Sequence, residues 1–119
     1  MPILDVQIVR TQKDPAGLAQ RLADAAGDAL ASRPRGTWVR LHFLEAHNYG
    51  ENGGAEPRVA PVFVTVLQAE VPKGAVLEAM ANQLTAAIAD VCKRPAEHVH
   101  VVFEPNAKGR VAFGGRLQT

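Results

Sequence analysis

The sequence has 119 residues, of which 47% are hydrophobic and 21% are charged, and this composition is typical of one soluble globular domain. Thirteen lysines and arginines against twelve aspartates and glutamates leave a formal net charge of +1, which argues against nucleic acid and anionic membranes as partners. Residues 1–5 hold no basic segment followed by an apolar stretch, and no run is long enough to span a bilayer, so we expect a cytoplasmic protein. The single cysteine, Cys92, is expected to be a buried reduced thiol.

A strand followed by a helix is predicted at the start of the chain. Residues 2–9 are apolar, rich in β-branched side chains and bounded by turn-forming residues, which indicates a strand. Asp14 is expected to cap the next helix, with Pro15 in the first helical position, and the helix should end before Pro34. Its apolar stripe comprises Leu18, Leu22, Ala25, Ala26, Ala29 and Leu30.

The middle of the chain completes this unit and begins a second one like it. Apolar residues alternate at 37–45, which predicts a strand, and the glycine-rich residues 49–54 predict a turn or short hairpin. Residues 61–68 predict another strand. The helix that follows should end near Cys92, ahead of Pro95, because apolar residues recur at helical spacing at Leu77, Met80, Leu84, Ala87, Ile88 and Val91.

The last part of the chain again predicts a strand, at 98–104, and a glycine-rich turn or hairpin, at 109–115. The two halves therefore align at a shift of about 60 residues, which indicates an internal repeat. We interpret the chain as one domain, residues 1–119, that contains repeat 1 at 2–55 and repeat 2 at 61–117.

Each repeat is a β-α-β unit, and right-handed crossovers place both helices over one face of the sheet. The predicted fold is α/β (α+β): a four-stranded mixed sheet, two helices on one face and a short C-terminal hairpin. The opposite face carries a mixture of side chains that suits a subunit interface lining a site: Trp38, Arg40, His42, His98, His100 and Val102. We therefore expect a closed cyclic oligomer, and specifically a trimer.

Pro2, the β-α-β repeat and the Gly-Gly segment near the end together resemble the tautomerase superfamily, in particular fused relatives of 4-oxalocrotonate tautomerase. Residues 95–104, followed by 107–110 and 113–115, are similar to that family's strand and C-terminal hairpin, and the resemblance covers essentially the whole chain. It implies a homotrimer and a cofactor-independent isomerase. The implied reaction is keto-enol proton transfer on a small 2-hydroxydienoate or 2-keto carboxylic acid.

The resemblance makes Pro2 the general base once Met1 has been removed. A free α-amine has a pKa of about 7.7 to 8.0, and burial or nearby cations lower it toward neutrality. Pro61 occupies the matching position in the second repeat, but its nitrogen is an amide and cannot act as a base. The simpler interpretation is that Pro2 only begins an edge strand.

A carboxylate substrate needs fixed cations and a shaped wall. The resemblance gives Arg40 the position of a substrate-binding arginine, and its planar guanidinium suits a carboxylate, although a surface ion pair is the simpler interpretation. His100 is its equivalent in the second repeat, and Arg110 offers further positive charge. Tyr49 and Phe113 are the two candidates for the aromatic wall.

Three alternatives remain. Related fused decarboxylases and dehalogenases carry arginines just after the strand that opens the second half, where residues 69–73 here offer only Lys73, so tautomerisation is favoured over hydration, dehalogenation or decarboxylation. His98, His100 and His42 raise a metal hypothesis, but alternating histidines more often line an interface, and we predict no metal and no cofactor. A non-catalytic oligomeric binding protein with this fold is the last alternative.

Overall fold

The computed structural model describes residues 2–119. Its elements in chain order are β1 (Ile3–Val9), α1 (Leu18–Ala29), β2 (Trp38–Leu44), η1 (Ala46–Asn48), β3 (Val62–Leu67), α2 (Gly74–Cys92), η2 (Ala96–His98), β4 (Val99–Phe103), β5 (Ala112–Phe113) and β6 (Arg116–Leu117). Within these residues, no helix is both long and apolar enough to cross a membrane.

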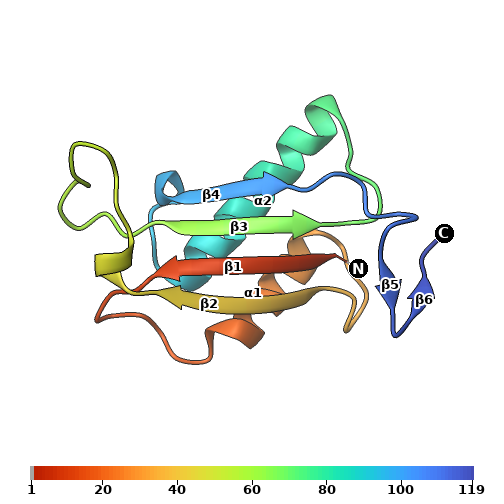
Figure 1. Cartoon of the computed structure of the whole chain (residues 1–119), viewed down its shortest axis with the longest axis horizontal. Helices are drawn as coiled ribbons and strands as arrows, with labels where there is room; N and C mark the ends of the chain where they lie inside the picture. The colour runs from red at the N-terminus through yellow and green to blue at the C-terminus, as the bar shows by residue number, and fades with distance from the viewer. Residues whose placement is uncertain (1) are drawn as a thin grey trace.

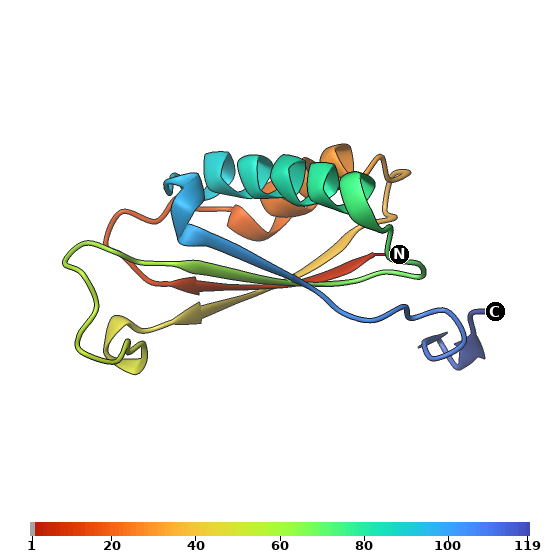
Figure 2. The ribbon, with the colours of Figure 1, turned by 90° about the horizontal axis from the view of Figure 1, so that it is seen from above.

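The strands form one four-stranded sheet in the order β2-β1-β3-β4, and β5 and β6 form a separate hairpin (Figure 1). Each repeat contributes a parallel pair, β1 with β2 and β3 with β4, and the repeats join through the antiparallel pair β1 and β3. Both helices cover the same face of the sheet and leave the other face open (Figure 2). The predicted mixed sheet, one-sided helices and C-terminal hairpin are therefore confirmed.

The core lies between the sheet and the helices. Alternate residues of the two central strands are at most 1% exposed, namely Leu4, Val6 and Ile8 in β1 and Val62, Val64 and Val66 in β3. They pack against Leu22 of α1 and Leu84 and Ile88 of α2. Cys92, at the end of α2, is buried as predicted, and this burial raises the pKa of its thiol to about 11.

Two local predictions were wrong. Helix α1 begins at Leu18, after Gly17, whose positive φ of 68° suits glycine, so Asp14 is not its cap and Pro15 is not helical. His98 belongs to the 3-10 turn η2, which begins after Pro95, and the strand starts one residue later.

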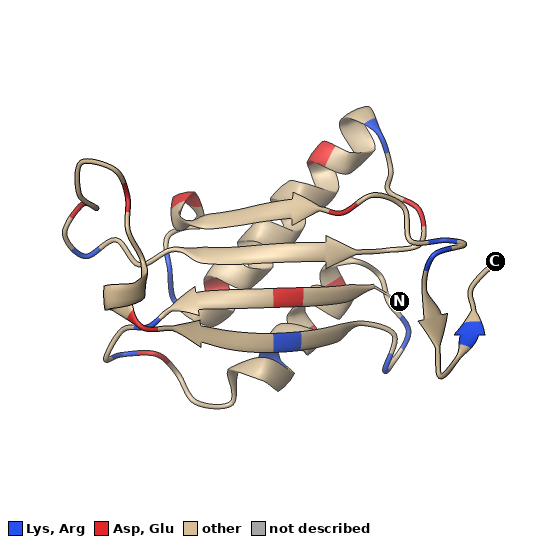
Figure 3. Ribbon diagram, in the orientation of Figure 1, with Lys and Arg blue, Asp and Glu red and all other residues tan. Residues whose placement is uncertain are grey.

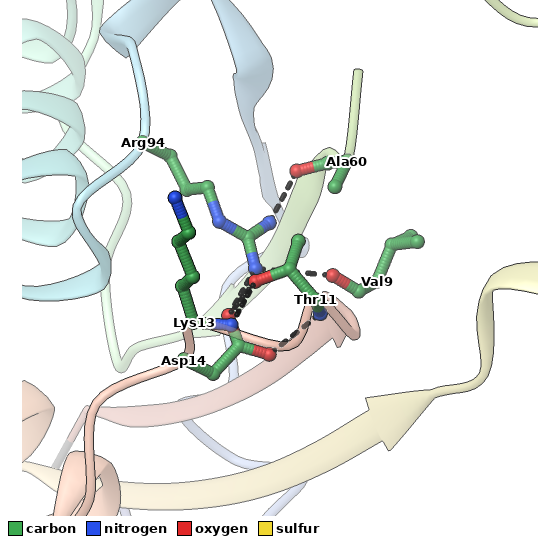
Figure 4. A network of polar contacts seen from close by, with 6 residues as sticks. All are labelled: Val9, Thr11, Lys13, Asp14, Ala60 and Arg94. Atoms are coloured by element: carbon green, nitrogen blue, oxygen red, sulfur yellow. Dashed lines mark hydrogen bonds and ion pairs between the residues drawn. The ribbon is translucent and has the colours of Figure 1, made fainter. Parts of the chain in front are cut away.

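Asp14 instead takes part in a buried polar network (Figure 4). It accepts hydrogen bonds from the backbone N–H and the hydroxyl of Thr11 at 2.8 Å each, and it pairs with Arg94 at 2.5 Å. Arg94 also donates to the carbonyl oxygens of Ala60 and Val9, so one guanidinium ties the end of β1 to the residues before β3. Burial opposes ionisation of Asp14, but the hydrogen bonds from Thr11 and Arg94 outweigh it and lower the pKa of Asp14.

Candidate active site

The sheet has two chemically different ends. We call the end where β1 begins the Pro2 end, and the opposite end, where β1 finishes, the Arg94 end. At the Pro2 end, the buried Pro2 precedes β1, and its carbonyl oxygen accepts a hydrogen bond from the backbone N–H of Trp38 at 3.0 Å. Ile3 lies opposite Trp38 in the parallel pair, which places Thr37 beside Pro2.

Trp38 forms an aromatic wall at the Pro2 end. Its indole N–H donates to the carbonyl oxygen of Arg35 at 2.9 Å, and its ring meets Phe113 of the hairpin edge-on, with 5.4 Å between centroids. The Trp38 side chain is still 48% exposed. Phe113, one of the two aromatic residues proposed from the sequence, therefore lies at the Pro2 end. Trp38 was expected on the open sheet face, but its place at the Pro2 end was not predicted, because it follows from the register of β1 and β2.

The loop before β2 is fixed by its own polar contacts. Thr37 is the one buried polar residue in the core of residues 2–119, and its hydroxyl lies 2.5 Å from that of Ser32. The Ser32 N–H also donates to the carbonyl oxygen of Gly27 at 2.8 Å. These contacts hold the loop against α1 and so fix the start of β2, whose first N–H binds Pro2.

Cations gather at the Pro2 end, on the loop before β2, the segment before β5, and β6 (Figure 3). Arg110 donates only to the backbone carbonyl oxygens of Asn106, at 3.0 Å, and Pro105, at 3.2 Å. Because these acceptors are neutral, its charge is not compensated. Arg35 and Arg116 likewise form no ion pair within residues 2–119, whereas Lys108 is paired with Glu70 at 3.2 Å.

Arg40 lies in the middle of the open sheet face. Its guanidinium binds both carboxylate oxygens of Asp5, its neighbour across β1, at 2.6 and 2.8 Å. The hydrogen bonds and charge of Asp5 raise the pKa of Arg40. Arg40 is three residues beyond Thr37, roughly 10 Å along the strand from the position beside Pro2. Within one chain, Arg40 is therefore paired with the Asp5 carboxylate and lies away from Pro2.

Tyr49 and His100 lie at the Arg94 end. Both flank Phe63, with ring centroids 6.0 Å from Tyr49 and 5.6 Å from His100. Phe63 is opposite Gln7, five residues after Pro2, so roughly 17 Å separates this cluster from Pro2. The Tyr49 hydroxyl donates to Glu51 at 2.5 Å, and this hydrogen bond raises the pKa of Tyr49.

The histidines considered as metal ligands do not converge. His42 is on β2 and His100 on β4, the two edge strands of the sheet, and His98 is in η2. Three strand spacings, roughly 14 Å, separate the two edges. Among residues 2–119, no three His, Cys, Asp or Glu side chains are grouped so that they could hold a metal ion.

No protein-family model matches this sequence, and no curated protein sequence matches it. Solved structures, in contrast, share its fold. A fused 4-OT, a wild-type symmetric trimer, is 19% identical with a TM-score of 0.73, covering 98% of this chain and 94% of the other. A macrophage migration inhibitory factor from Oncomelania hupensis is 21% identical with a TM-score of 0.75, covering 100% and 83%.

A member of the cis-3-chloroacrylic acid dehalogenase family gives the same result, at 21% identity and a TM-score of 0.71, covering 98% of this chain and 83% of the other. The three structures come from proteins with different names, and each aligns with nearly the whole chain. At these identities the likeness concerns the fold and leaves the chemistry open. The chain therefore has the tautomerase-like β-α-β fold.

Proposed function

We propose that this protein is a cofactor-independent tautomerase of the tautomerase superfamily, with Pro2 as its general base after removal of Met1. The observation that carries the proposal is the position of Pro2. It immediately precedes β1 of a fused 4-OT-like fold, at the end of the sheet where Trp38 meets Phe113 and where Arg110 has no carboxylate partner in residues 2–119. Pro61, its counterpart in the second repeat, has an amide nitrogen and lies buried in the core.

The reaction needs a neutral amine near pH 7. A free α-amine has a pKa of about 7.7 to 8.0, and burial together with the cations of the Pro2 end lowers it. The neutral amine takes a proton from the carbon next to the substrate carbonyl and returns it at another position, which interconverts enol and keto forms. Acid-base catalysis of this kind contributes about 10² to 10⁴ in rate.

The substrate is a small 2-hydroxydienoate or 2-keto carboxylic acid. Arg110 is the guanidinium in the Pro2 end that we assign to the carboxylate, because backbone carbonyls orient it without neutralising its charge. Trp38 and Phe113 hold the apolar part of the substrate. A substrate with a planar enol next to a carboxylate fits this arrangement, because the carboxylate would bind the guanidinium and the planar part would lie against the aromatic rings.

We infer further that the active form is a homotrimer, as the fused 4-OT with this fold is. In a closed ring, each contact joins two different patches of neighbouring subunits. The open sheet face of one subunit, which carries Arg40, and its Arg94 end, which carries Tyr49 and His100, can then complete the site at the Pro2 end of the next. To bind the substrate carboxylate, the Arg40 guanidinium would first have to release the carboxylate of Asp5.

Two measurements test the function. Mass spectrometry of the purified protein should show loss of Met1, and the protein should ketonise phenylenolpyruvate or 2-hydroxymuconate. Pro2→Ala should lower kcat/KM by at least about 10²-fold, because the constrained secondary amine is lost. Pro61→Ala is the matched control and should keep its activity per folded molecule. A retained Met1, or a Pro2→Ala variant as active as its parent, would refute the proposed mechanism.

A further inference from the structure

Gln68 lies beside Pro2 on the strand next to β1. Ile3 is opposite Leu67 in the antiparallel pair of β1 and β3, so one further step places Gln68 across from Pro2. The Val9 N–H donates to the Pro61 carbonyl oxygen at 3.1 Å, which makes this pair hydrogen-bonded. Hydrogen-bonded and non-hydrogen-bonded pairs alternate along an antiparallel ladder, so the pair at Ile3 is hydrogen-bonded and the next pair, Pro2 with Gln68, is not. Facing side chains come closest in non-hydrogen-bonded pairs.

The two side chains also share a face of the sheet. Pro2 is in phase with the buried Leu4, and Gln68 is in phase with the buried Val66, so both lie on the side covered by the helices. The amide nitrogen of Gln68 donates to the carbonyl oxygen of Glu70 at 3.0 Å and contacts the sulfur of Met80 at 3.9 Å. These contacts fix which way the amide faces.

This orientation leaves the amide oxygen of Gln68 buried without a hydrogen-bond donor among residues 2–119. A buried acceptor without a partner is destabilising, and most such atoms in folded proteins do have one. Residues 2–119 supply no donor to this oxygen while Pro2 is bonded to Met1, and the facing position of Pro2 across the strand pair is where a new donor would arise.

We propose that the Gln68 side-chain oxygen accepts a hydrogen bond from the Pro2 amine and thereby orients it for catalysis. The inference rests on the proposed function, since a proline nitrogen bonded to Met1 has no hydrogen to donate. Removal of Met1 leaves one N–H on the neutral amine and two on the charged one. When one N–H points at Gln68, the other position, lone pair or proton, is directed at the substrate.

The hydrogen bond has a consequence with a definite sign. An acceptor favours the charged amine over the neutral one and so raises the pKa of the Pro2 amine. Gln68→Met keeps the chain length and removes the acceptor, so the pKa should fall by about 1, whereas Gln68→Glu adds a negative charge and should raise it by about 1 or more. ¹⁵N NMR of protein labelled with ¹⁵N-proline measures this titration without any turnover.

A kinetic measurement complements the titration. In Gln68→Met the kcat for phenylenolpyruvate should fall about tenfold while KM stays close to that of the parent, because the amine loses its orientation and the carboxylate site is intact. The midpoint of the pH profile of kcat/KM should move in the same direction as the NMR titration.

Gln118→Met is the matched control, because Gln118 has the other buried amide oxygen without a donor in residues 2–119. It should leave the titration of the Pro2 amine unchanged. If both Gln68 variants titrate like the parent, the inference is wrong and Pro2 still stands as the base. If Gln68→Met does not fold, the direction of the shift in Gln68→Glu decides. A retained Met1 overturns the inference together with the proposed function, and the protein mass reveals that case.

Discussion

The two ends of the sheet are built from equivalent loops of the two repeats, and they differ in how their arginines are used. At the Arg94 end, the loop after α2 buries Arg94 against Asp14, with side chains only 8% and 9% exposed. At the Pro2 end, the loop after α1 leaves Arg33 and Arg35 exposed and without ion pairs in residues 2–119. The two equivalent loops thus differ: one has its arginine buried in an ion pair, and the other leaves its arginines exposed, as the proposed binding of an anionic substrate requires.

The largest expected effect follows from breaking the closed end. Arg94→Met leaves the buried carboxylate of Asp14 without its partner and removes the donor to Val9 and Ala60. We expect the free energy of unfolding, measured by denaturant titration, to fall by about 3 to 5 kcal/mol. Activity per folded molecule should stay unchanged, since the contacts of Arg94 are with Asp14, Val9 and Ala60 and none of these residues is assigned to the site. A loss below about 1 kcal/mol would show that the contacts of Arg94 with Asp14, Val9 and Ala60 do not stabilise this end of the sheet.

The same network predicts a dependence of stability on pH. The pKa of Asp14 is lower in the folded protein than its ordinary value of 3.8, so its ionisation stabilises the fold above that value. This contribution is lost as the pH falls from 3.8 through the lower folded pKa. In Asp14→Asn the stability at neutral pH should be reduced, and its difference from the parent should shrink over that acidic interval. Unfolding curves at several pH values check this, and a difference that does not depend on pH would contradict it.

The open end should respond more weakly. Phe113→Ala removes the edge-on contact that attaches the hairpin to Trp38, and such pairs contribute about 0.5 to 1.5 kcal/mol beyond the area they bury. We expect a small loss of stability together with faster hydrogen exchange in β5 and β6. Protection in β1 and β3 should not change. Equal loss of protection throughout the sheet would show that the hairpin is not a separate, weakly held unit.

The smallest effect is expected at Arg40. Its pair with Asp5 is on the open face, with side chains 65% and 42% exposed, and exposed pairs contribute little to stability. Arg40→Gln should therefore leave the thermal unfolding temperature of the monomer unchanged. If the trimer uses Arg40 in the site of the next subunit, KM for a carboxylate substrate should nevertheless rise. An unchanged KM would remove Arg40 from the site.

Periodicity was sufficient to predict the core and the layers. The alternation in β2 and β4 and the apolar stripe of α1 indicate the same inward side chains that the structure packs into the core or against it. The capping prediction for Asp14 failed because the signature Asp-Pro is local, whereas the partner that binds Asp14 is Arg94, 80 residues away. A contact of that range leaves no periodic signal in the sequence.

The candidate site could be predicted only in part for a related reason. Pro2 and Phe113 were proposed from the family resemblance, but Trp38 and Gln68 acquire their relation to Pro2 through strand register. Register depends on the pairing of whole strands, which the spacing within one strand does not determine. Tyr49 and His100 present a different problem. They lie at the Arg94 end, so they can reach a Pro2 site only across the subunit contact of the proposed trimer.

Trp38 is the single tryptophan of the chain, and this residue is 48% exposed at the Pro2 end. Its emission, excited at 295 nm, therefore comes from one place in the molecule and needs no label to be assigned. Any small acid that enters the Pro2 end should change the surroundings of that one fluorophore, so candidate ligands that are not turned over can also be screened, by optical titration.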